Sequence, residues 1–143
     1  MFANPDDETL RQLLEEAQTI AVVGHSNKPH RDSYRVAQYL RSAGYIVYPV
    51  NPAVDEIDGQ RCYRTLAEVP EAVDIVNVFR RSEFLAEIVR EAIAIQAKGI
   101  WAQLGVVDEG AARVAVAGGA IVVMDACIKV EHHRLGIAVK RRF

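Results

Sequence analysis

The chain has 143 residues, of which half are hydrophobic and a quarter are charged, and its formal net charge is −2. This composition is typical of one globular domain. No apolar run reaches the roughly 20 residues that a bilayer-spanning helix needs, and the small net charge gives no reason to expect nucleic acid. The acidic start, residues 1–8, does not resemble a secretory signal. We therefore expect a single cytoplasmic domain over residues 1–143, with no membrane or nucleic-acid partner.

The first part of the chain alternates between helical and extended patterns. Hydrophobic residues recur every three or four positions over residues 6–17, which predicts an amphipathic helix. The β-branched run 19–23 predicts a buried strand that ends at Gly24. A second helical pattern begins near residue 32 and stops at Gly44, a residue that favours helix ends.

The alternation continues through the rest of the chain. Pro49 lies within the next extended run and has no amide N–H for a sheet ladder, so we expect a strand end or an irregular edge there. Residues 53–72 carry turn signals and are expected to form a loop with a short helix near Leu66. The further expected strands are 45–50, 73–79, 99–104 and 120–124, and the further expected helices are 82–97, 109–117 and a short one near residue 125.

The expected strands are continuously apolar, as in a parallel sheet that is covered on both faces. Strands and helices also alternate, which is typical of α/β proteins. The sequence therefore predicts an α/β fold: a three-layer, doubly wound, Rossmann-like domain with a five-stranded parallel sheet. In such domains ligands bind beyond the carboxyl ends of the strands, where the strand order reverses.

The segment after the first strand has the composition of a phosphate-binding loop. Gly24 permits a sharp turn, and the amides at the start of the following helix would face an anion. Lys28 and Arg31 add positive charge beside those amides. Arg80 and Arg81 follow another strand and would lie on the same rim of the sheet. This concentration of cationic residues predicts an anionic ligand.

Two common nucleotide signatures are missing. The loop has one glycine instead of G-x-G-x-x-G, and the second strand ends in Asn51 where a dinucleotide site has a carboxylate for the ribose hydroxyls. The kinase-type loop G-x-x-x-x-G-K-[S/T] is also absent. Together these differences weigh against a nicotinamide cofactor.

Five motifs lie at successive strand ends: Gly24-x-Ser26-x-Lys28-Pro29 with Arg31 and Ser33, Tyr48-Pro49-Val50-Asn51-Pro52, Val78-Phe79-Arg80, Trp101-x-Gln103-x-Gly105, and Asp125-x-Cys127 with Val130-Glu131-His132. In this order they resemble the small stand-alone CoA-binding protein family, which is similar to the N-terminal CoA-binding domain of the succinyl-CoA synthetase alpha subunit. The resemblance runs from about residue 20 to residue 135. Asp32 departs from it, because the family is expected to carry proline there, and an acid would weaken the local positive field.

The resemblance implies that the chain binds coenzyme A or an acyl-CoA and assigns roles to the strand-end residues. The loop after the first strand would hold the diphosphate, the next strand end would shape the pocket edge, the third would line the adenosine and pantetheine path, and the fourth would lie toward the thiol. The implied cofactor-binding residues are Gly24, His25, Ser26, Lys28, Arg31, Ser33, Asn51, Pro52, Val78, Phe79, Arg80, Gln103, Gly105 and Cys127.

Each of these residues also has a purely structural interpretation. Ser26 could cap a helix, Lys28 and Arg31 could be solvated surface charges, Phe79 could belong to the core, and Gln103 could satisfy a backbone group. The C-terminal basic cluster, Lys140, Arg141 and Arg142 with Lys129 and Arg134, is either a solvated tail or a second anchor for the anion.

Cys127 is the one candidate nucleophile, and its alternative role is that of a small buried hydrophobic residue. If it faces the pocket, we expect a mixed disulfide with CoA under oxidation. Cys62 is the second cysteine, and we expect no structural disulfide in a reducing compartment. The histidines lack the spacing of a metal site, and no partnered Ser-His-Asp, Cys-His or paired-carboxylate arrangement is evident.

The sequence thus favours a CoA-binding, nucleotide-binding module without a catalytic residue or a metal. One alternative is an NAD(P)-dependent oxidoreductase or another nucleotide-using enzyme, against which Asn51 speaks. Another is a regulatory subunit that senses acyl-CoA, either as a homodimer or docked on a larger enzyme. The sequence alone does not distinguish free CoA from acyl-CoA.

Overall fold

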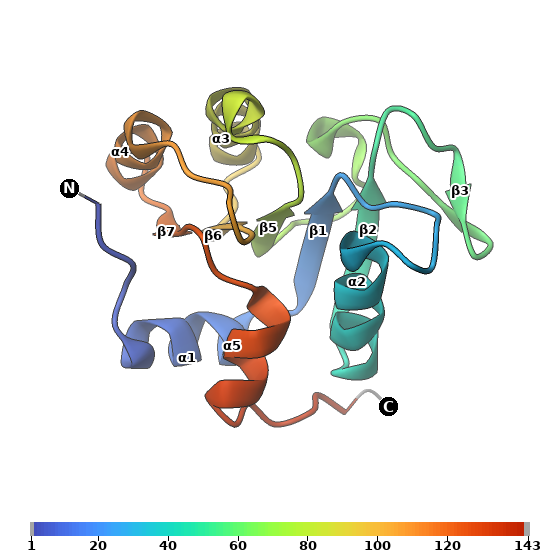
Figure 1. The fold of residues 1–143 in the computed structure, drawn as a ribbon, viewed down its shortest axis with the longest axis horizontal. Coiled ribbons are helices and arrows are strands. Elements are labelled where there is room, and N and C mark those ends of the chain that lie inside the picture. The colour runs from blue at the N-terminus through green and yellow to red at the C-terminus, as the bar shows by residue number, and fades with distance from the viewer. Residues whose placement is uncertain (1, 142–143) are drawn as a thin grey trace.

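A computed structural model describes residues 2–141, which form a parallel sheet between two layers of helices (Figure 1). The strands of this sheet are β1 (Thr19–Val23), β2 (Ile46–Val50), β5 (Ile75–Val78), β6 (Gly99–Ala102) and β7 (Ile121–Val123), and a separate hairpin consists of β3 (Glu56–Ile57) and β4 (Gln60–Arg61). The helices are α1 (Asp7–Glu16), α2 (Asp32–Ser42), α3 (Leu85–Ala94), α4 (Glu109–Ala117) and α5 (Ile128–Arg134), with 3-10 turns η1 (Leu66–Glu68) and η2 (Ser82–Phe84).

The strand order is β2-β1-β5-β6-β7, and all neighbours in the sheet are parallel. The chain therefore starts near the middle of the sheet, moves outward to β2, and then crosses back over β1 to β5. This reversal leaves a crevice beyond the carboxyl ends of β1 and β5, which is where α/β sheets bind ligands. The prediction of a doubly wound, five-stranded parallel sheet is confirmed.

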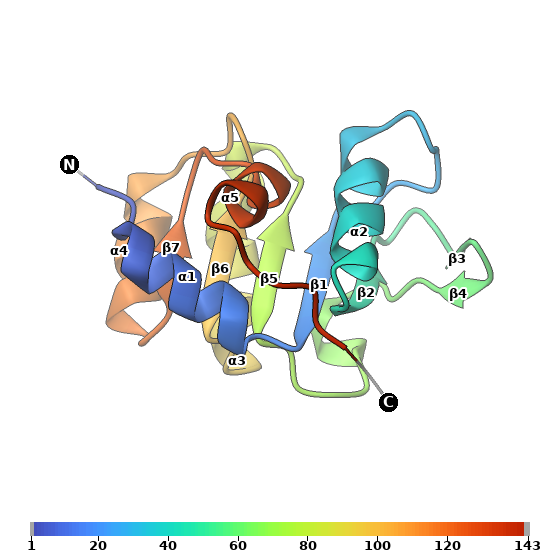
Figure 2. The same cartoon turned by 90° about the horizontal axis from the view of Figure 1, so that it is seen from below.

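Alternation along the strands divides the core into two layers. In β1, Ala21 and Val23 pack with the side chains of α3 and α4, whereas Ile20 and Val22 pack with those of α1, α2 and α5. Figure 2 shows α1, α5 and α2 lying across one face of the sheet. Because both faces are covered, the strands need apolar residues at every position, which explains the continuous hydrophobic runs.

Two predicted elements differ from the structure. The region 53–72 contains the β3–β4 hairpin, because Asp58 and Gly59 both take positive φ values, of 50° and 83°, as a two-residue hairpin turn requires. The predicted helix over 82–97 begins instead as the turn η2 and continues as α3 only to Ala94. Its end is set by Gln96, whose φ of 59° is incompatible with a continuing helix.

Pro49 lies inside β2, in register with Val22, so the strand does not end there. β2 is the outermost strand of the sheet, as expected for a strand with a proline. Its outer side is covered by the segment after the hairpin, where the Tyr63 amide donates to the Pro49 carbonyl at 2.9 Å. Within residues 2–141, no helix is both long enough and apolar enough to span a bilayer.

Candidate functional site

Gly24 sets the path of the loop that leaves β1. Its φ is +87°, and a Cβ atom there would lie 2.4 Å from the Phe79 carbonyl oxygen. Its amide donates to the Val50 carbonyl at 2.8 Å, so the residue is held between the ends of β2 and β5. Only glycine combines this backbone conformation with so close an approach. The loop therefore begins at the crevice where the strand order reverses.

Hydrogen bonds fold the loop back onto the start of α2. The Ser26 amide donates to Ser33 Oγ at 2.9 Å, and the Lys28 amide donates to Ser26 Oγ at 3.0 Å. The N-cap residue of α2 is Arg31, whose side chain makes no capping hydrogen bond. Among residues 2–141, the first-turn amides of α2 therefore have no side-chain acceptor at the positive end of the helix dipole. This arrangement suits an anion.

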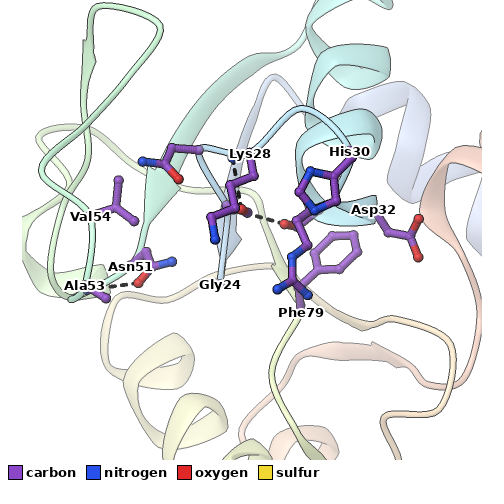
Figure 3. A pocket seen from close by; sticks show the side chains of 12 residues that line it. Gly24, Lys28, His30, Asp32, Asn51, Ala53, Val54 and Phe79 are labelled. Carbon is purple, nitrogen blue, oxygen red and sulfur yellow. Dashed lines mark hydrogen bonds between the residues drawn. The ribbon is translucent and has the colours of Figure 1, made fainter.

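A cleft of about 870 Å³ opens in front of this loop. We call it the loop cleft, and Figure 3 shows Lys28, Asn51 and Phe79 around it. Among residues 2–141, no ion pair holds Lys28 or Arg31, so both cations are available at its rim. Asp32, the residue that departs from the family pattern, also lines the cleft, and its carboxylate lies 4.0 Å from Arg35.

His25 supports the loop from beneath and does not line the cleft, because its side chain is fully buried. Arg41 Nη1 lies 3.2 Å from His25 Nε2, and because a guanidinium only donates, Nε2 is the acceptor. The proton therefore sits on Nδ1, which donates to the Ser26 carbonyl at 2.8 Å. Burial is the main cause that lowers the pKa of His25 to about 4, so the ring is neutral at pH 7.

Asn51 uses both ends of its amide to shape the far wall of the loop cleft. Its Nδ2 donates to the His25 carbonyl at 3.0 Å, and its Oδ1 accepts from the Ala53 amide at 2.9 Å. The side chain thereby ties the end of β2 to the loop after β1. A carboxylate in the same place would have no N–H to donate to His25.

A second cavity, of about 370 Å³, lies beside α5, and we call it the Cys127 cavity. Its walls include Gln103 at the end of β6 and Cys127 just before α5. Asp32 and Phe79 line both this cavity and the loop cleft, so the two hollows meet at these residues. We refer to the two neighbouring hollows together as the groove, which lies along the carboxyl edge of the sheet.

The structure gathers most of the expected ligand residues in this groove. The loop cleft is lined by Gly24, Ser26, Lys28, Arg31, Ser33, Asn51 and Phe79, and the Cys127 cavity by Phe79, Gln103 and Cys127. Val78 lies in the core with no exposed surface, so its side chain does not reach either hollow. Gly105 lies just beyond β6, where its amide donates to Asp125 Oδ1 at 2.8 Å.

Arg80 and Pro52 lie apart from the groove, in a separate cavity on the α3 side of the sheet. Successive residues of an extended segment point to opposite faces, so Phe79 and Arg80 diverge. The Arg80 guanidinium carbon lies 4.3 Å from the centre of the Phe84 ring. Lys28 and Arg31 therefore line one cleft, as expected, whereas Arg80 does not.

Several groove residues were not identified from the sequence. Arg35 and Val36 follow Asp32 by three and four positions, a helical spacing that could have indicated their common side of α2. Leu104 lies between Gln103 and Gly105 at a predicted strand end, a position that also favours a place at the ligand site. The sequence analysis did not assign to the ligand site Asn27, His30, Ala53 and Val54 in the loop cleft, or Arg35, Val36 and Leu104 in the Cys127 cavity. Lys129 of the basic cluster and Val130 of the fifth motif also line the Cys127 cavity.

The C-terminal basic cluster is divided among different roles. Arg134 donates to both carboxylate oxygens of Asp7, at 2.8 and 3.0 Å, which ties α5 to α1. Lys140 packs at the other end of α1, where its Nζ donates to the Glu15 carbonyl at 2.5 Å. Lys129 lines the Cys127 cavity, and Arg142 lies outside the described residues.

The two cysteines differ in their surroundings. Cys62 is buried, its thiol lies 3.6 Å from the Asn51 carbonyl, and burial raises its pKa. Cys127 is half-buried, and neither cysteine takes part in a disulfide. Residues 2–141 contain no group of three or more His, Cys, Asp or Glu side chains that could hold a metal ion.

Known proteins resemble this chain over most of its length. The Bacillus subtilis protein YneT, which is uncharacterised, is 42% identical over 129 residues, covering 90% of this chain and 96% of YneT. A solved structure of a hypothetical protein from Pyrococcus horikoshii has a TM-score of 0.89 at 36% identity, covering 94% of this chain and 97% of that one. A Thermus thermophilus structure has a TM-score of 0.87 at 37% identity, covering 92% and 99%.

A further relative is a much larger protein. The alpha subunit of acetate–CoA ligase (ADP-forming) II from Pyrococcus furiosus is 33% identical over 82 residues, which are 57% of this chain but only 18% of that subunit. Residues 18–133 match the family described as “CoA binding domain”, and this range includes every residue that lines the groove. The chain therefore belongs to the CoA-binding domain family.

Proposed function

We propose that this chain binds coenzyme A or an acyl-CoA in the groove formed by the loop cleft and the Cys127 cavity, without catalysing a reaction of its own. The observation that carries the proposal is the open start of α2. Uncapped first-turn amides, Lys28 and Arg31 face one cleft of about 870 Å³. Amides at a helix start and charge-assisted contacts from lysine and arginine suit a diphosphate.

The shape of the groove supports a ligand that is longer than a nucleotide. The loop cleft is lined by polar and cationic residues, whereas Phe79, Leu104 and Val130 contribute apolar surface to the Cys127 cavity. Coenzyme A is divided in a similar way, because its phosphates carry the charge and its pantetheine arm is uncharged. In this pose the diphosphate lies against the loop and the arm passes Phe79 toward Cys127.

The proposal that the chain lacks catalysis of its own rests on the partners of its buried histidines. His25 is committed to Ser26 and Arg41, and His132 Nδ1 lies 2.8 Å from the Tyr39 hydroxyl. Neither ring is paired with a serine or cysteine in the described part of the chain, as an activated nucleophile would require. His30 and Asp32 line the loop cleft, but neither is hydrogen-bonded to a serine or cysteine among residues 2–141. The groove thus offers binding groups without a partnered nucleophile.

Ligand binding is tested by calorimetry and thermal shift with CoA, acetyl-CoA, ADP and NAD. A ligand at about 100 times its dissociation constant adds about 2.7 kcal/mol of apparent stability. We expect CoA or acetyl-CoA to stabilise the protein most and ADP to act less. The absence of any response to millimolar CoA would refute the proposal.

The same experiments address the two alternatives. Preferential stabilisation by NAD or NADP would indicate a nicotinamide enzyme. Asn51 and the single loop glycine are evidence against this alternative. A change of molecular mass in light scattering that occurs with acetyl-CoA but not with CoA would indicate an acyl-CoA sensor. Equal binding of both ligands with constant mass fits a simple binding module.

A further inference from the structure

The Cys127 cavity contains a thiol that the proposed binding function does not use. Cys127 is half-buried and lines the cavity together with Gln103 and Phe79. The cavity shares two lining residues, Asp32 and Phe79, with the loop cleft. A ligand that fills both hollows would therefore bring its far end to the sulfur of Cys127.

Gln103 supplies an independent indication that a ligand occupies this cavity. It is only 6% exposed, and its Oε1 accepts from the Ile128 amide at 3.0 Å and from Asn77 Nδ2 at 3.1 Å. A backbone N–H can only donate, so the contact with Ile128 identifies this atom as the oxygen. The other atom, Nε2, has no hydrogen-bond partner among residues 2–141 and is left to face the cavity that Gln103 lines.

Gln103 and Cys127 both line the cavity. Ile128, which holds Gln103 Oε1, directly follows Cys127 in the chain. Gln103 Nε2 keeps contact with solvent, so it can exchange water for a carbonyl acceptor from a ligand. In the pantetheine arm the last amide carbonyl precedes the sulfur by one nitrogen and two methylene groups. An acceptor on Gln103 would thus leave the sulfur of the same arm close to Cys127.

We propose that Cys127 forms a mixed disulfide with coenzyme A by thiol–disulfide exchange. This proposal rests on the proposed binding function. The co-reactant is the symmetrical disulfide of coenzyme A. The Cys127 thiolate attacks one sulfur, the coenzyme S–S bond breaks, and a bond forms between Cys127 and that coenzyme. The second coenzyme leaves as a thiolate and takes up the proton that Cys127 lost to solvent. The protein thiol is oxidised and one coenzyme is reduced.

Reduced full-length protein is incubated with coenzyme A disulfide or with glutathione disulfide at about 10 µM, and intact mass is followed with time. Binding in the groove raises the effective concentration of the coenzyme disulfide to the millimolar range, so its adduct should form about 100-fold faster than that of glutathione. Equal rates for the two disulfides would overturn the proposal, because the groove would then contribute nothing.

Two cysteine variants locate the adduct. Cys127→Ser should abolish it, whereas Cys62→Ser should leave its rate unchanged, because the Cys62 thiol is buried against the Asn51 carbonyl. An adduct that persists in Cys127→Ser would contradict the assignment. Gln103→Glu keeps the acceptor for Ile128 but removes the donor, so it should slow the reaction with coenzyme A disulfide and not that with glutathione disulfide.

Calorimetry with reduced CoA separates this inference from the function on which it rests. If Cys127→Ser and the unmodified protein both bind reduced CoA but no covalent adduct forms, the exchange reaction is wrong and the binding function stands. If neither protein binds reduced CoA, the binding function itself fails. Binding of reduced CoA together with an adduct on Cys127 supports both.

Discussion

The two halves of the groove are built in different ways. The loop cleft is formed largely by consecutive residues, from Gly24 to Ser33, that connect one strand to one helix. The Cys127 cavity is assembled from α2, the ends of β5 and β6, and the start of α5, which are far apart in the sequence. The first half offers amides and the cations Lys28 and Arg31. The second offers apolar surface, the Gln103 amide and a thiol, with charged residues, Asp32, Arg35 and Lys129, around them.

This difference determines how sensitive each half of the groove is to mutation. The loop cleft depends on a single backbone path, which is fixed by Gly24 at its start and by the buried His25 beneath it. The Cys127 cavity has several walls, and most of its side chains can be changed without altering a backbone turn. We therefore expect large effects from a few positions in the loop cleft and smaller, graded effects around the cavity.

The largest effect is expected from Gly24→Ala. The new Cβ would combine a φ of +87° with a contact of 2.4 Å to the Phe79 carbonyl oxygen. Backbone strain of this kind costs about 1–3 kcal/mol before the clash is counted, so we expect a loss of about 3 kcal/mol in urea unfolding together with loss of CoA binding. Gly59→Ala is the control, because its φ is +83° but nothing lies within 4 Å, and it should cost about 1 kcal/mol. Equal losses would show that the close approach to Phe79 is unimportant.

The second effect concerns pH. The pKa of His25 is lowered from 6.5 to about 4, so the folded state disfavours its protonation. Neutral His25 therefore adds to the free energy of unfolding, and its full contribution is present above pH 6.5. The contribution is lost as the pH falls from 6.5 toward 4, by up to about 3 kcal/mol.

The contribution of His25 is isolated by comparing urea unfolding of the unmodified protein with that of His25→Gln between pH 7 and 4. The pKa of His132 is also lowered, mainly by burial, but this effect is common to both proteins and cancels in the difference. We expect the variant to lose less stability on acidification. Parallel pH profiles would mean that His25 is not held neutral.

Removing a cation from the loop cleft should weaken binding without affecting the fold. Lys28→Ala and Arg31→Ala should each reduce affinity for CoA and for ADP by about tenfold, the equivalent of one charge-assisted hydrogen bond. Urea unfolding should be unchanged, because neither side chain forms an ion pair within the described residues. Arg113→Ala, an exposed change on α4, is the control. Unaltered affinity in both loop variants would assign the anion to the amides alone.

The smallest effect is expected at the rim of the Cys127 cavity. Leu104 is 66% exposed there, and Leu104→Ser should weaken CoA binding about threefold through the loss of apolar contact while leaving ADP binding unchanged. Val114→Ser makes the same kind of change on α4, where Val114 is 52% exposed, and should alter neither affinity. An equal loss for ADP would mean that the two halves of the groove do not divide the ligand as proposed.

The differences between the sequence-based predictions and the structure have physical causes. The continuously apolar runs between helical patterns were sufficient to predict the sheet, because each strand is buried on both faces and must be hydrophobic on both. The β3–β4 hairpin was missed because its strands have only two residues each and leave almost no periodic pattern. Arg80 was grouped with Lys28 because both follow strands, but a single step along the chain places it on the α3 side of the sheet.

The sequence by itself determined the order of strands and helices and the character of the loop from Gly24 to Ser33, because both depend on neighbouring residues. Only the tertiary structure decided that His25 is a buried neutral support and that Gln103 and Cys127 share one cavity that meets the loop cleft at Phe79. Such relations depend on which strand ends become neighbours and on which face each side chain takes. Hydrophobic periodicity carries no information about contacts between residues so far apart in the chain.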